Sequence, residues 1–286
     1  MDDGDSGRRQ RPAEIDNTVP HSARIWNYWL GGKDNYRVDQ EAGDRFAETF
    51  PGIIDAARGS RHFLGRAVRH LAGEEGIRQF LDVGTGLPTV DNTHEIAQRV
   101  APGLPTVDNT HEIAQRVAPD ARVVYVDNDP LVLSHARALL TSTPEGVTDY
   151  VDADLRDPGT LLEAAARTLD FDRPVALMLL GVLGHVPDDA LAGSLVGSLL
   201  DALPPGSFLT LSDGTDVSAA RRNAHDRYNS SGAAPYHLRS PQGVEALFGG
   251  LELLEPGVVP VTEWRPDPSP FEPVPVTTYG AVARKR

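Results

Sequence analysis

The fold is decided by residues 79–86, which read QFLDVGTG. A short apolar run ends in Asp82, and the glycines Gly84 and Gly86 follow with Thr85 between them. Apolar runs of this length are typical of buried parallel strands, and glycine lets the backbone turn sharply at the end of a strand. A ligand at such a turn meets backbone N–H groups and the N-terminus of a helix. These four residues are therefore predicted to bind a nucleotide-type cofactor.

The two glycines do not complete a dinucleotide fingerprint. The G-x-G-x-x-G pattern requires a third glycine, but Leu87, Pro88 and Thr89 follow Gly86. An NAD(P)-dependent oxidoreductase is therefore a less favoured alternative. An ordinary strand-to-loop turn without a ligand is a further alternative for this stretch taken alone.

The composition excludes several classes of protein. The chain has 286 residues, a net charge of −14 and no cysteine. The length suits one large α/β domain or two small ones. The negative charge argues against a nucleic-acid or anionic-membrane partner, because phosphates favour clustered Lys and Arg. Without cysteine there are no disulfides, thiolate metal sites or cysteine nucleophiles. The nine histidines show no H-x-x-x-H or H-E-x-x-H spacing, so no metal site is expected.

No segment of the sequence predicts export or membrane insertion. The longest apolar run, residues 175–184, is about half the length that a membrane span requires. The chain opens with MDDGD and shows no apolar segment of a signal peptide. We therefore expect a cytoplasmic protein with no membrane partner. A homodimer is also compatible with the sequence.

The first 75 residues divide into a tail and a helical segment. Residues 1–18 are charged and aperiodic, which predicts a disordered tail. Residues 19–75 include RIWNYWLGGKDNY at positions 24–36, where apolar residues recur at helical spacing and a glycine pair ends the helix. One interpretation is a helix whose aromatic residues pack on the core, and the other is an N-terminal helical lid over the ligand. The candidate lid or substrate residues are Arg24, Tyr28 and Asn35.

A perfect duplication comes after the glycine turn. Residues 86–102 are repeated without change as residues 103–119. Each copy predicts a short helix, because Asn92 with Glu95, and Asn109 with Glu112, have the spacing of a capping box. Solenoid repeats need at least three units, so a solenoid is excluded.

Spacing indicates that one copy is an insertion. A nucleotide-binding fold places an acidic residue about 20 residues after the glycine turn, at the end of the second strand. The candidate, Asp127, lies 43 residues after Gly84, or 26 residues if one copy is removed. We expect the first copy, which adjoins the glycine turn, to form the helix that supports the cofactor. The second copy would then be extruded as a surface helix or loop, since a loop insertion costs little entropy.

Strands and helices alternate regularly after Asp127. Apolar strands are predicted at 147–151, 175–180 and 207–211, with helices between them. This alternation is typical of a doubly wound α/β fold with a mostly parallel sheet. The last two strands, at 251–261 and 277–283, lack a full helix between them, which predicts an antiparallel hairpin at the C-terminal edge of the sheet.

Acidic and glycine-rich segments come after three successive strands. The carboxyl ends of parallel strands meet at one edge, where open α/β sheets bind ligands. Asp127 and Asn128 end the second strand, and Asp154 and Leu155 come after the third. Asp127 suits a ribose diol, because a carboxylate can accept two hydrogen bonds, and Asp154 suits an adenine amino group. The alternative is that each aspartate caps a surface turn.

These segments carry a resemblance to a known family. LDVGTG (81–86), VDND (126–129) and DADL (152–155) resemble class I S-adenosylmethionine-dependent methyltransferases. LGVLGHVPD (180–188) is similar to their segment after strand four, with Gly184 where a histidine is more usual. RIWNYWLGGKDNY resembles the signature of an actinobacterial methyltransferase family formerly catalogued as a domain of unknown function, and this resemblance spans about residues 18–284.

The resemblance implies a Rossmann-like, seven-stranded sheet and S-adenosylmethionine as the cofactor. It implies that residues 76–286 form the cofactor-binding domain and that Gly181 belongs to the cofactor site. It supplies no acceptor, for which we expect a small molecule. A non-catalytic regulator that binds S-adenosylmethionine stays open as an alternative, because no catalytic residue is certain from the sequence.

The chemistry of methyl transfer needs few catalytic groups. The reaction is an in-line displacement, so positioning supplies much of the rate, and a base is needed only if the acceptor loses a proton. The candidate base is His185, whose alternative role is to cap the helix that begins near Asp188. Candidates for the acceptor pocket, each with an exposed loop position as its alternative, are His225, Tyr228, Tyr236 and His237.

Overall fold

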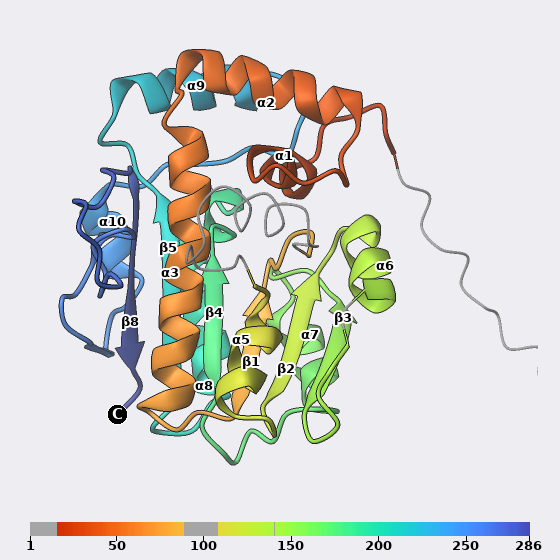
Figure 1. The fold of residues 1–286 in the computed structure, drawn as a ribbon, viewed down its shortest axis with the longest axis vertical. Helices are drawn as coiled ribbons and strands as arrows, with labels where there is room; N and C mark the ends of the chain where they lie inside the picture. The colour runs from red at the N-terminus through yellow and green to blue at the C-terminus, as the bar shows by residue number, and fades with distance from the viewer. Residues whose placement is uncertain (1–15, 89–107, 140) are drawn as a thin grey trace, which may run out of the picture.

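The structure is a computed structural model that describes residues 16–88, 108–139 and 141–286. Most of the predicted tail and most of the first 17-residue copy lie outside the described residues. A central sheet carries helices on both faces (Figure 1). Helices α3 (Ile53–Gly73) and α5 (Thr110–Val117) pack on one face, and α7 (Pro158–Ala165) and α8 (Asp189–Asp201) pack on the other.

The sheet confirms the predicted fold class. Among the described residues it has eight strands in the order β3-β2-β1-β4-β5-β8-β6, with β7 also paired to β8. Strands β1 to β5 pair in parallel, and β8 runs antiparallel to β5, β6 and β7. The bounds are β1 (Gln79–Val83), β2 (Arg122–Asp127), β3 (Val147–Asp152), β4 (Ala176–Leu180), β5 (Phe208–Gly214), β6 (Glu252–Leu253), β7 (Val259–Pro260) and β8 (Thr278–Arg284).

The eighth strand arises because the strand expected at 251–261 is divided. A turn at Pro256 and Gly257 separates β6 from β7, and the N–H of Gly257 donates to the carbonyl of Leu254 over 2.8 Å. Gly257 has φ +85°, a conformation that glycine adopts without a steric penalty. The C-terminal edge therefore consists of β8 and two short partners rather than one hairpin.

The remaining helices lie at the edges of the sheet. In Figure 1, α1, α2 and α9 form a layer above the carboxyl ends of the parallel strands. Helix α9 lies in the stretch 217–240, for which the sequence predicted no helix. The bounds are α1 (Ser22–Trp29), α2 (Arg37–Thr49), α6 (Pro130–Leu139), the 3-10 helix η1 (Leu183–His185), α9 (Ala219–Asn229) and α10 (Pro241–Ala246).

The second copy of the repeat forms the helix that packs on the sheet. Helix α5 begins after Asn109, whose N–H donates to Glu112 in the predicted capping box. The Thr110 hydroxyl donates to Asp82 Oδ2 over 2.6 Å, and the N–H of His111 donates to the Tyr125 hydroxyl over 2.8 Å. The expectation that the second copy is extruded is therefore wrong.

The two copies have the same residues and differ only in the segments that flank them along the chain. The second copy leads directly into β2 through Ala121, which is fully buried and whose carbonyl accepts a hydrogen bond from Gln115 over 3.1 Å. The first copy leads into Gly103 and Leu104 instead. Because the two copies have identical side chains, only this tertiary contact distinguishes them.

The hydrogen bond between Thr110 and Asp82 gives a test of this assignment. We expect Thr110→Val to lower the free energy of unfolding by about 1–3 kcal/mol, because it leaves a buried carboxylate without its donor. The matched control is Thr93→Val, the same substitution in the first copy, which leaves that hydrogen bond intact. Urea unfolding of both variants measures the difference. Equal destabilisation by the two substitutions would contradict the assignment.

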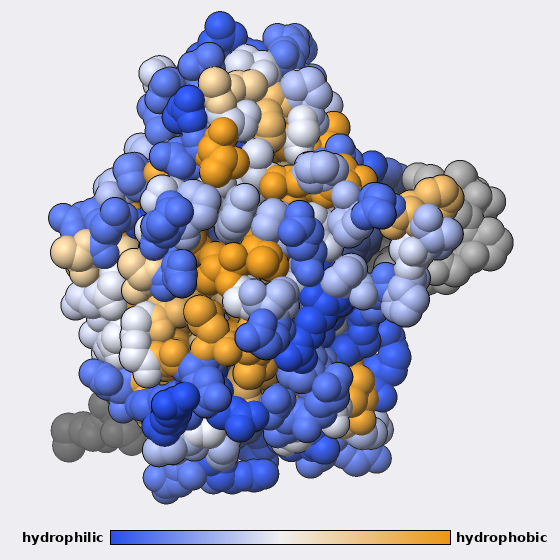
Figure 2. Space-filling view, turned by 90° about the vertical axis from the view of Figure 1, so that its left-hand side faces the viewer, coloured by the Kyte–Doolittle hydropathy of each residue, from blue (hydrophilic) through white to orange (hydrophobic). Residues whose placement is uncertain are grey.

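Two features of the exterior complete the fold. No helix in the described ranges is both long and apolar enough to cross a membrane. Figure 2 shows apolar residues gathered in the middle of the face on the side of α10 and β8, surrounded by hydrophilic residues. Apolar patches often mark partner surfaces. The homodimer and the cytoplasmic location expected from the sequence both stay predictions.

Candidate functional site

A cavity of about 310 Å³ lies at the carboxyl ends of the parallel strands, beneath the layer of α1, α2 and α9 (Figure 1). Its lining includes every residue that the sequence assigned to the cofactor, together with the candidate base His185 and the candidate acceptor residues His225, Tyr228 and Tyr236. The nine cofactor candidates are Asp82, Gly84, Thr85, Gly86, Asp127, Asn128, Asp154, Leu155 and Gly181.

The glycines bring backbone, rather than side chains, to the cavity wall. Gly84, Gly86 and Gly181 have φ of +73°, +68° and +74°. A Cβ atom on Gly86 or Gly181 would meet no protein atom within 4 Å, whereas one on Gly84 would lie 2.5 Å from the Val182 side chain. The turn after β1 therefore requires glycine, and it leaves room for a ligand to approach the backbone closely.

A carboxylate, that of Asp82, and a guanidinium, that of Arg61, lie together below this turn. Asp82 ends β1 with its side chain buried, and burial raises its pKa to about 6, partly offset by the Thr110 hydrogen bond and by the charge of Arg61. Arg61 on α3 also lines the cavity, and burial lowers its pKa. Arg61 had no signal in the sequence, because β1 separates α3 from the glycine turn. This pair offers one negative and one positive group to a zwitterionic ligand.

The ends of β2 and β3 bring two further carboxylates, those of Asp127 and Asp154, to the cavity wall. Asp127 Oδ2 accepts from the N–H of Gly86 over 2.9 Å, and Oδ1 accepts from the N–H of Asp129 over 2.9 Å. Burial raises the pKa of Asp127. The Asn128 amide lies 3.4 Å from Asp154 Oδ2, so the two strand ends are close enough to contact one ligand.

Two histidines line the other end of the cavity, near β4 and β5. His185 Nδ1 lies 2.8 Å from the carbonyl of Pro235, and His225 Nδ1 lies 3.0 Å from the carbonyl of Arg221. A carbonyl only accepts, so each Nδ1 carries the proton and each Nε2 has a free lone pair in the neutral ring. Burial lowers the pKa of His185 and lowers that of His225 to about 4. Both rings are therefore neutral at physiological pH.

The buried carboxylate of Asp213 holds Tyr236, which lines this end of the cavity. The Tyr236 hydroxyl donates to Asp213 at the end of β5, and Arg239 Nη1 lies 3.0 Å from the other carboxylate oxygen. A Cβ atom on Gly184 would overlap the Tyr236 ring. Glycine at this position, where the resemblance leads one to expect histidine, is what lets Tyr236 pack against η1.

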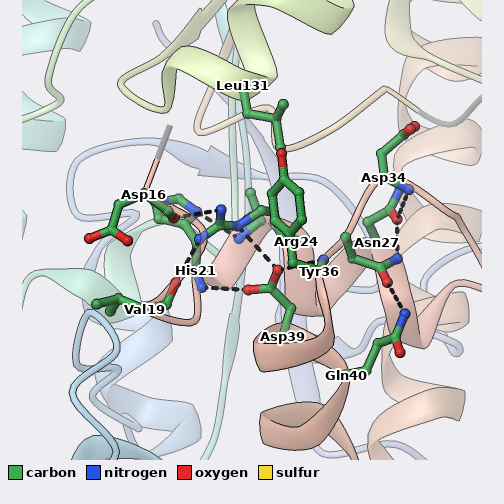
Figure 3. Close-up of polar contacts among 12 residues, drawn as sticks. Asp16, Val19, His21, Arg24, Asn27, Asp34, Tyr36, Asp39, Gln40 and Leu131 are labelled. Carbon is green, nitrogen blue, oxygen red and sulfur yellow. Dashed lines mark hydrogen bonds and ion pairs between the residues drawn. The ribbon is translucent and has the colours of Figure 1, made fainter. Parts of the chain in front are cut away.

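Arg24, one of the candidate lid or substrate residues, does not line the cavity. The residue is 3% exposed, and its guanidinium donates to the carbonyls of Asp16 and Val19 and lies 3.3 Å from Asp39 Oδ2. Figure 3 shows these contacts converging on Arg24, with Tyr36 stacked beside it. Arg24 therefore fastens α1 to α2 and has no donor directed at a ligand.

Three further candidates also lie outside the cavity lining. The Tyr28 hydroxyl donates to Asp44 over 2.7 Å, and the Asn35 amide donates to Asn27 over 2.8 Å. His237 is exposed, and its backbone N–H donates to the carbonyl of Gly184. Helical spacing placed Tyr28 on the apolar face of α1, but the residues of α1 that face the cavity are others, namely Ser22, Ala23, Ile25, Trp26 and Trp29.

Several lining residues had no signal in the sequence. His21, Phe46 and Arg221 reach the cavity from α1, α2 and α9. His21 caps the N-terminus of α1, and its Nδ1 lies 2.9 Å from Asp129 Oδ2.

Among the described residues, no group of three or more His, Cys, Asp or Glu side chains is arranged to hold a metal ion.

Comparisons with known proteins agree with this geometry. The family model described as S-adenosyl methyltransferase matches residues 8–103 and 101–286, two segments that meet at the junction of the 17-residue copies. None of the curated proteins is significantly similar to the chain.

Solved structures are similar over nearly the whole chain. A DUF574 family protein from Streptomyces avermitilis MA-4680 is 44% identical, with a TM-score of 0.85 over 96% of this chain and 100% of its own. A Thermobifida fusca YX protein assigned as a methyltransferase is 39% identical, with a TM-score of 0.82 over 97% of this chain and 99% of its own. Magnesium protoporphyrin IX methyltransferase from Synechocystis PCC 6803, solved with S-adenosylhomocysteine, is 12% identical, with a TM-score of 0.51 over 92% of this chain and 93% of its own. At this level of identity the similarity shows the fold alone.

The alternatives of an oxidoreductase and a non-catalytic regulator find no support in these comparisons. The matched family names the cofactor, and the cavity presents the glycine turn and strand-end acids that this cofactor needs. The chain belongs to the S-adenosyl methyltransferase family, and it is an S-adenosylmethionine-dependent methyltransferase.

Proposed function

We propose that the enzyme methylates a small molecule that loses a proton during transfer. The observation that carries this proposal is the continuity of one cavity, which joins the glycine turn of β1 to the neutral ring of His185 beyond β4. The volume of about 310 Å³ and the cover of helices above it favour a small acceptor over a macromolecule.

The residues at the ends of β1 to β3 suit the cofactor. Asp127 would accept from both ribose hydroxyls, and Asp154 would accept from the adenine amino group. The carboxylate of Asp82 and the guanidinium of Arg61 would face the amino and carboxylate groups of the methionine portion. Gly86 and Gly181, which leave open space where a Cβ would project, make the cradle that this group needs.

His185 would act as the base. The bound cofactor supplies an electrophilic methyl group on a sulfonium centre. Nε2 of His185 has a free lone pair, because Nδ1–H is held by the carbonyl of Pro235, and the lowered pKa keeps the ring neutral. The ring is also fixed by Tyr236, whose centroid lies 5.2 Å away at 86°. A neutral, oriented imidazole can accept the proton of a hydroxyl or amine acceptor.

Residues 19–75 would act as the lid. Trp26 and Trp29 on α1 line the cavity, and α1 is held to the rest of the site by the contacts of His21 with Asp129 and of Arg24 with Asp39. A cover of this kind excludes water from the transferring methyl group and strengthens the polar interactions beneath it. Helix α1 therefore both packs against its neighbours and forms a wall of the site.

Calorimetric titration with S-adenosylhomocysteine tests the cofactor site. We expect saturable one-to-one binding by the full chain and by a chain that lacks residues 103–119, and no binding of NAD⁺. Deleting either copy produces the same shortened sequence, so one copy remains to form α5. Binding of NAD⁺ without binding of S-adenosylhomocysteine would contradict the proposed site. Binding by the shortened chain alone would show that the duplication obstructs it.

A further inference from the structure

Arg221 is a buried cation at the edge of the cavity that has no ion-pair partner among the described residues. The residue is 3% exposed and lines the cavity from the first turn of α9. Its Nη1 donates to the hydroxyls of Thr277 and Thr278 over 2.7 and 3.2 Å, whereas Nε has no hydrogen-bond partner. Within the described ranges, no carboxylate lies within ion-pair distance of this guanidinium.

The charged and titratable groups near Arg221 do not neutralise it. Asp213 is the acid that interacts with it, but the two oxygens of this carboxylate are taken by Tyr236 and Arg239. His225, one turn along α9, is neutral. The Phe50 ring lies 5.9 Å from the guanidinium carbon and offers only a weak cation–π contact. A buried charge without a partner is costly, so the arrangement is explained if a ligand brings the anion.

The cavity wall beside Arg221 is aromatic. Trp26, Trp29, Phe46, His225, Tyr236 and His185 all line the cavity. Successive ring centroids along this series are 5.9, 5.1, 4.8, 5.3 and 5.2 Å apart. The series runs from the covering helix α1 to the candidate base. Aromatic walls of this kind suit a planar apolar ligand, because rings pack edge to face or offset at these distances.

We infer that the acceptor is an aromatic carboxylate. Its ring packs against the aromatic wall, its carboxylate pairs with Arg221, and its hydroxyl or amine lies at Nε2 of His185. This inference rests on the proposed function and names the substrate class of the same site. The methionine carboxylate of the cofactor is matched by Arg61 instead, because Arg61 lies beside Asp82 at the glycine turn.

Paired aromatic probes test the inference. The chain is saturated with S-adenosylhomocysteine and titrated with 2-naphthoate and with its neutral isostere 2-naphthamide, with quenching of tryptophan fluorescence as the readout. We expect the carboxylate to bind at least about 10-fold more tightly than the amide. In Arg221→Gln this preference should fall below about 3-fold, while Arg221→Lys, which keeps the charge, should retain part of it.

Matched controls separate the outcomes. Arg222→Gln removes the neighbouring exposed charge of α9 and should leave the preference unchanged. S-adenosylhomocysteine affinity should stay within about 3-fold in all these variants. Equal affinity of the unmodified chain for the two probes, or no binding of naphthoate, would overturn the inference. So would a loss of S-adenosylhomocysteine affinity in Arg221→Gln and Arg221→Lys, which would assign Arg221 to the cofactor. Failure of the unmodified chain to bind S-adenosylhomocysteine would instead overturn the proposed function.

Discussion

Asp127→Ala is expected to weaken S-adenosylhomocysteine binding by about 100-fold. In the proposed site the carboxylate accepts from two ribose hydroxyls, and hydrogen bonds to a charged group contribute about 1.5–3 kcal/mol each. A loss of about 3 kcal/mol corresponds to roughly 100-fold in the dissociation constant. The same carboxylate accepts from the N–H of Gly86, so the substitution also releases the glycine turn. Calorimetric titration measures the loss.

Asp152 provides the control for this substitution. It lies opposite Asp127 in the register of β2 and β3, but its side chain is exposed and does not line the cavity. Asp152→Ala removes the same charge from the same edge of the sheet and should leave the affinity unchanged. An equal loss in both variants would mean that the general charge of this edge, and not a ribose contact, accounts for the effect.

The affinity for S-adenosylhomocysteine is expected to fall about 10-fold between pH 7 and pH 5. Burial raises the pKa of Asp82 to about 6, so its carboxylate is mostly ionised at pH 7 and mostly protonated at pH 5. Only the ionised form attracts the ammonium of the methionine portion, so the affinity falls with the ionised fraction. In Asp82→Asn the affinity should be weaker and nearly independent of pH over this range.

The direction of this effect distinguishes it from acid unfolding. Because the folded-state pKa of Asp82 lies above the ordinary value of 3.8, the folded chain binds more protons than the unfolded chain between about pH 4 and 6. The contribution of Asp82 to the free energy of unfolding therefore rises as the pH falls through this window. Calorimetry at each pH should be paired with thermal unfolding. A pH dependence that persists unchanged in Asp82→Asn would assign it to another group.

The strand-end half of the candidate site could be predicted because its residues lie at the ends of apolar runs. Asp82, Asp127 and Asp154 each come at or just after the end of an apolar run, and the carboxyl ends of parallel strands meet at one edge of a sheet. Once the runs are recognised as parallel strands, their last residues must lie close together. In the structure all three residues line one cavity, and recognising the parallel strands in the sequence is enough to predict this.

The acceptor half could not be predicted in this way. Arg221 and His225 lie on α9, a polar helix whose sequence, AARRNAHDRYN, has too few apolar residues for a clear helical pattern. His225 was a candidate acceptor residue on its residue type alone, whereas Arg221 had no signal in the sequence. Their position over the cavity results from packing of α9 against α2, where Phe46 contacts the rings of His225 and Tyr228. Arg24 shows the opposite error, because a charged residue beside an aromatic motif resembles a substrate contact until its donors are traced to Asp16, Val19 and Asp39.

The sequence by itself determined the α/β fold, the glycine turn after β1 and the acids at the ends of β2 and β3. These features depend on short apolar runs and on the residues immediately after them. Only the tertiary structure decided which copy of the duplicated segment forms α5. The two copies have the same residues and hence the same helical preference, so the choice depends on Ala121 and β2, which adjoin the second copy alone. The tertiary structure likewise brought Arg221 to the cavity, because its place depends on contacts between segments far apart in the chain.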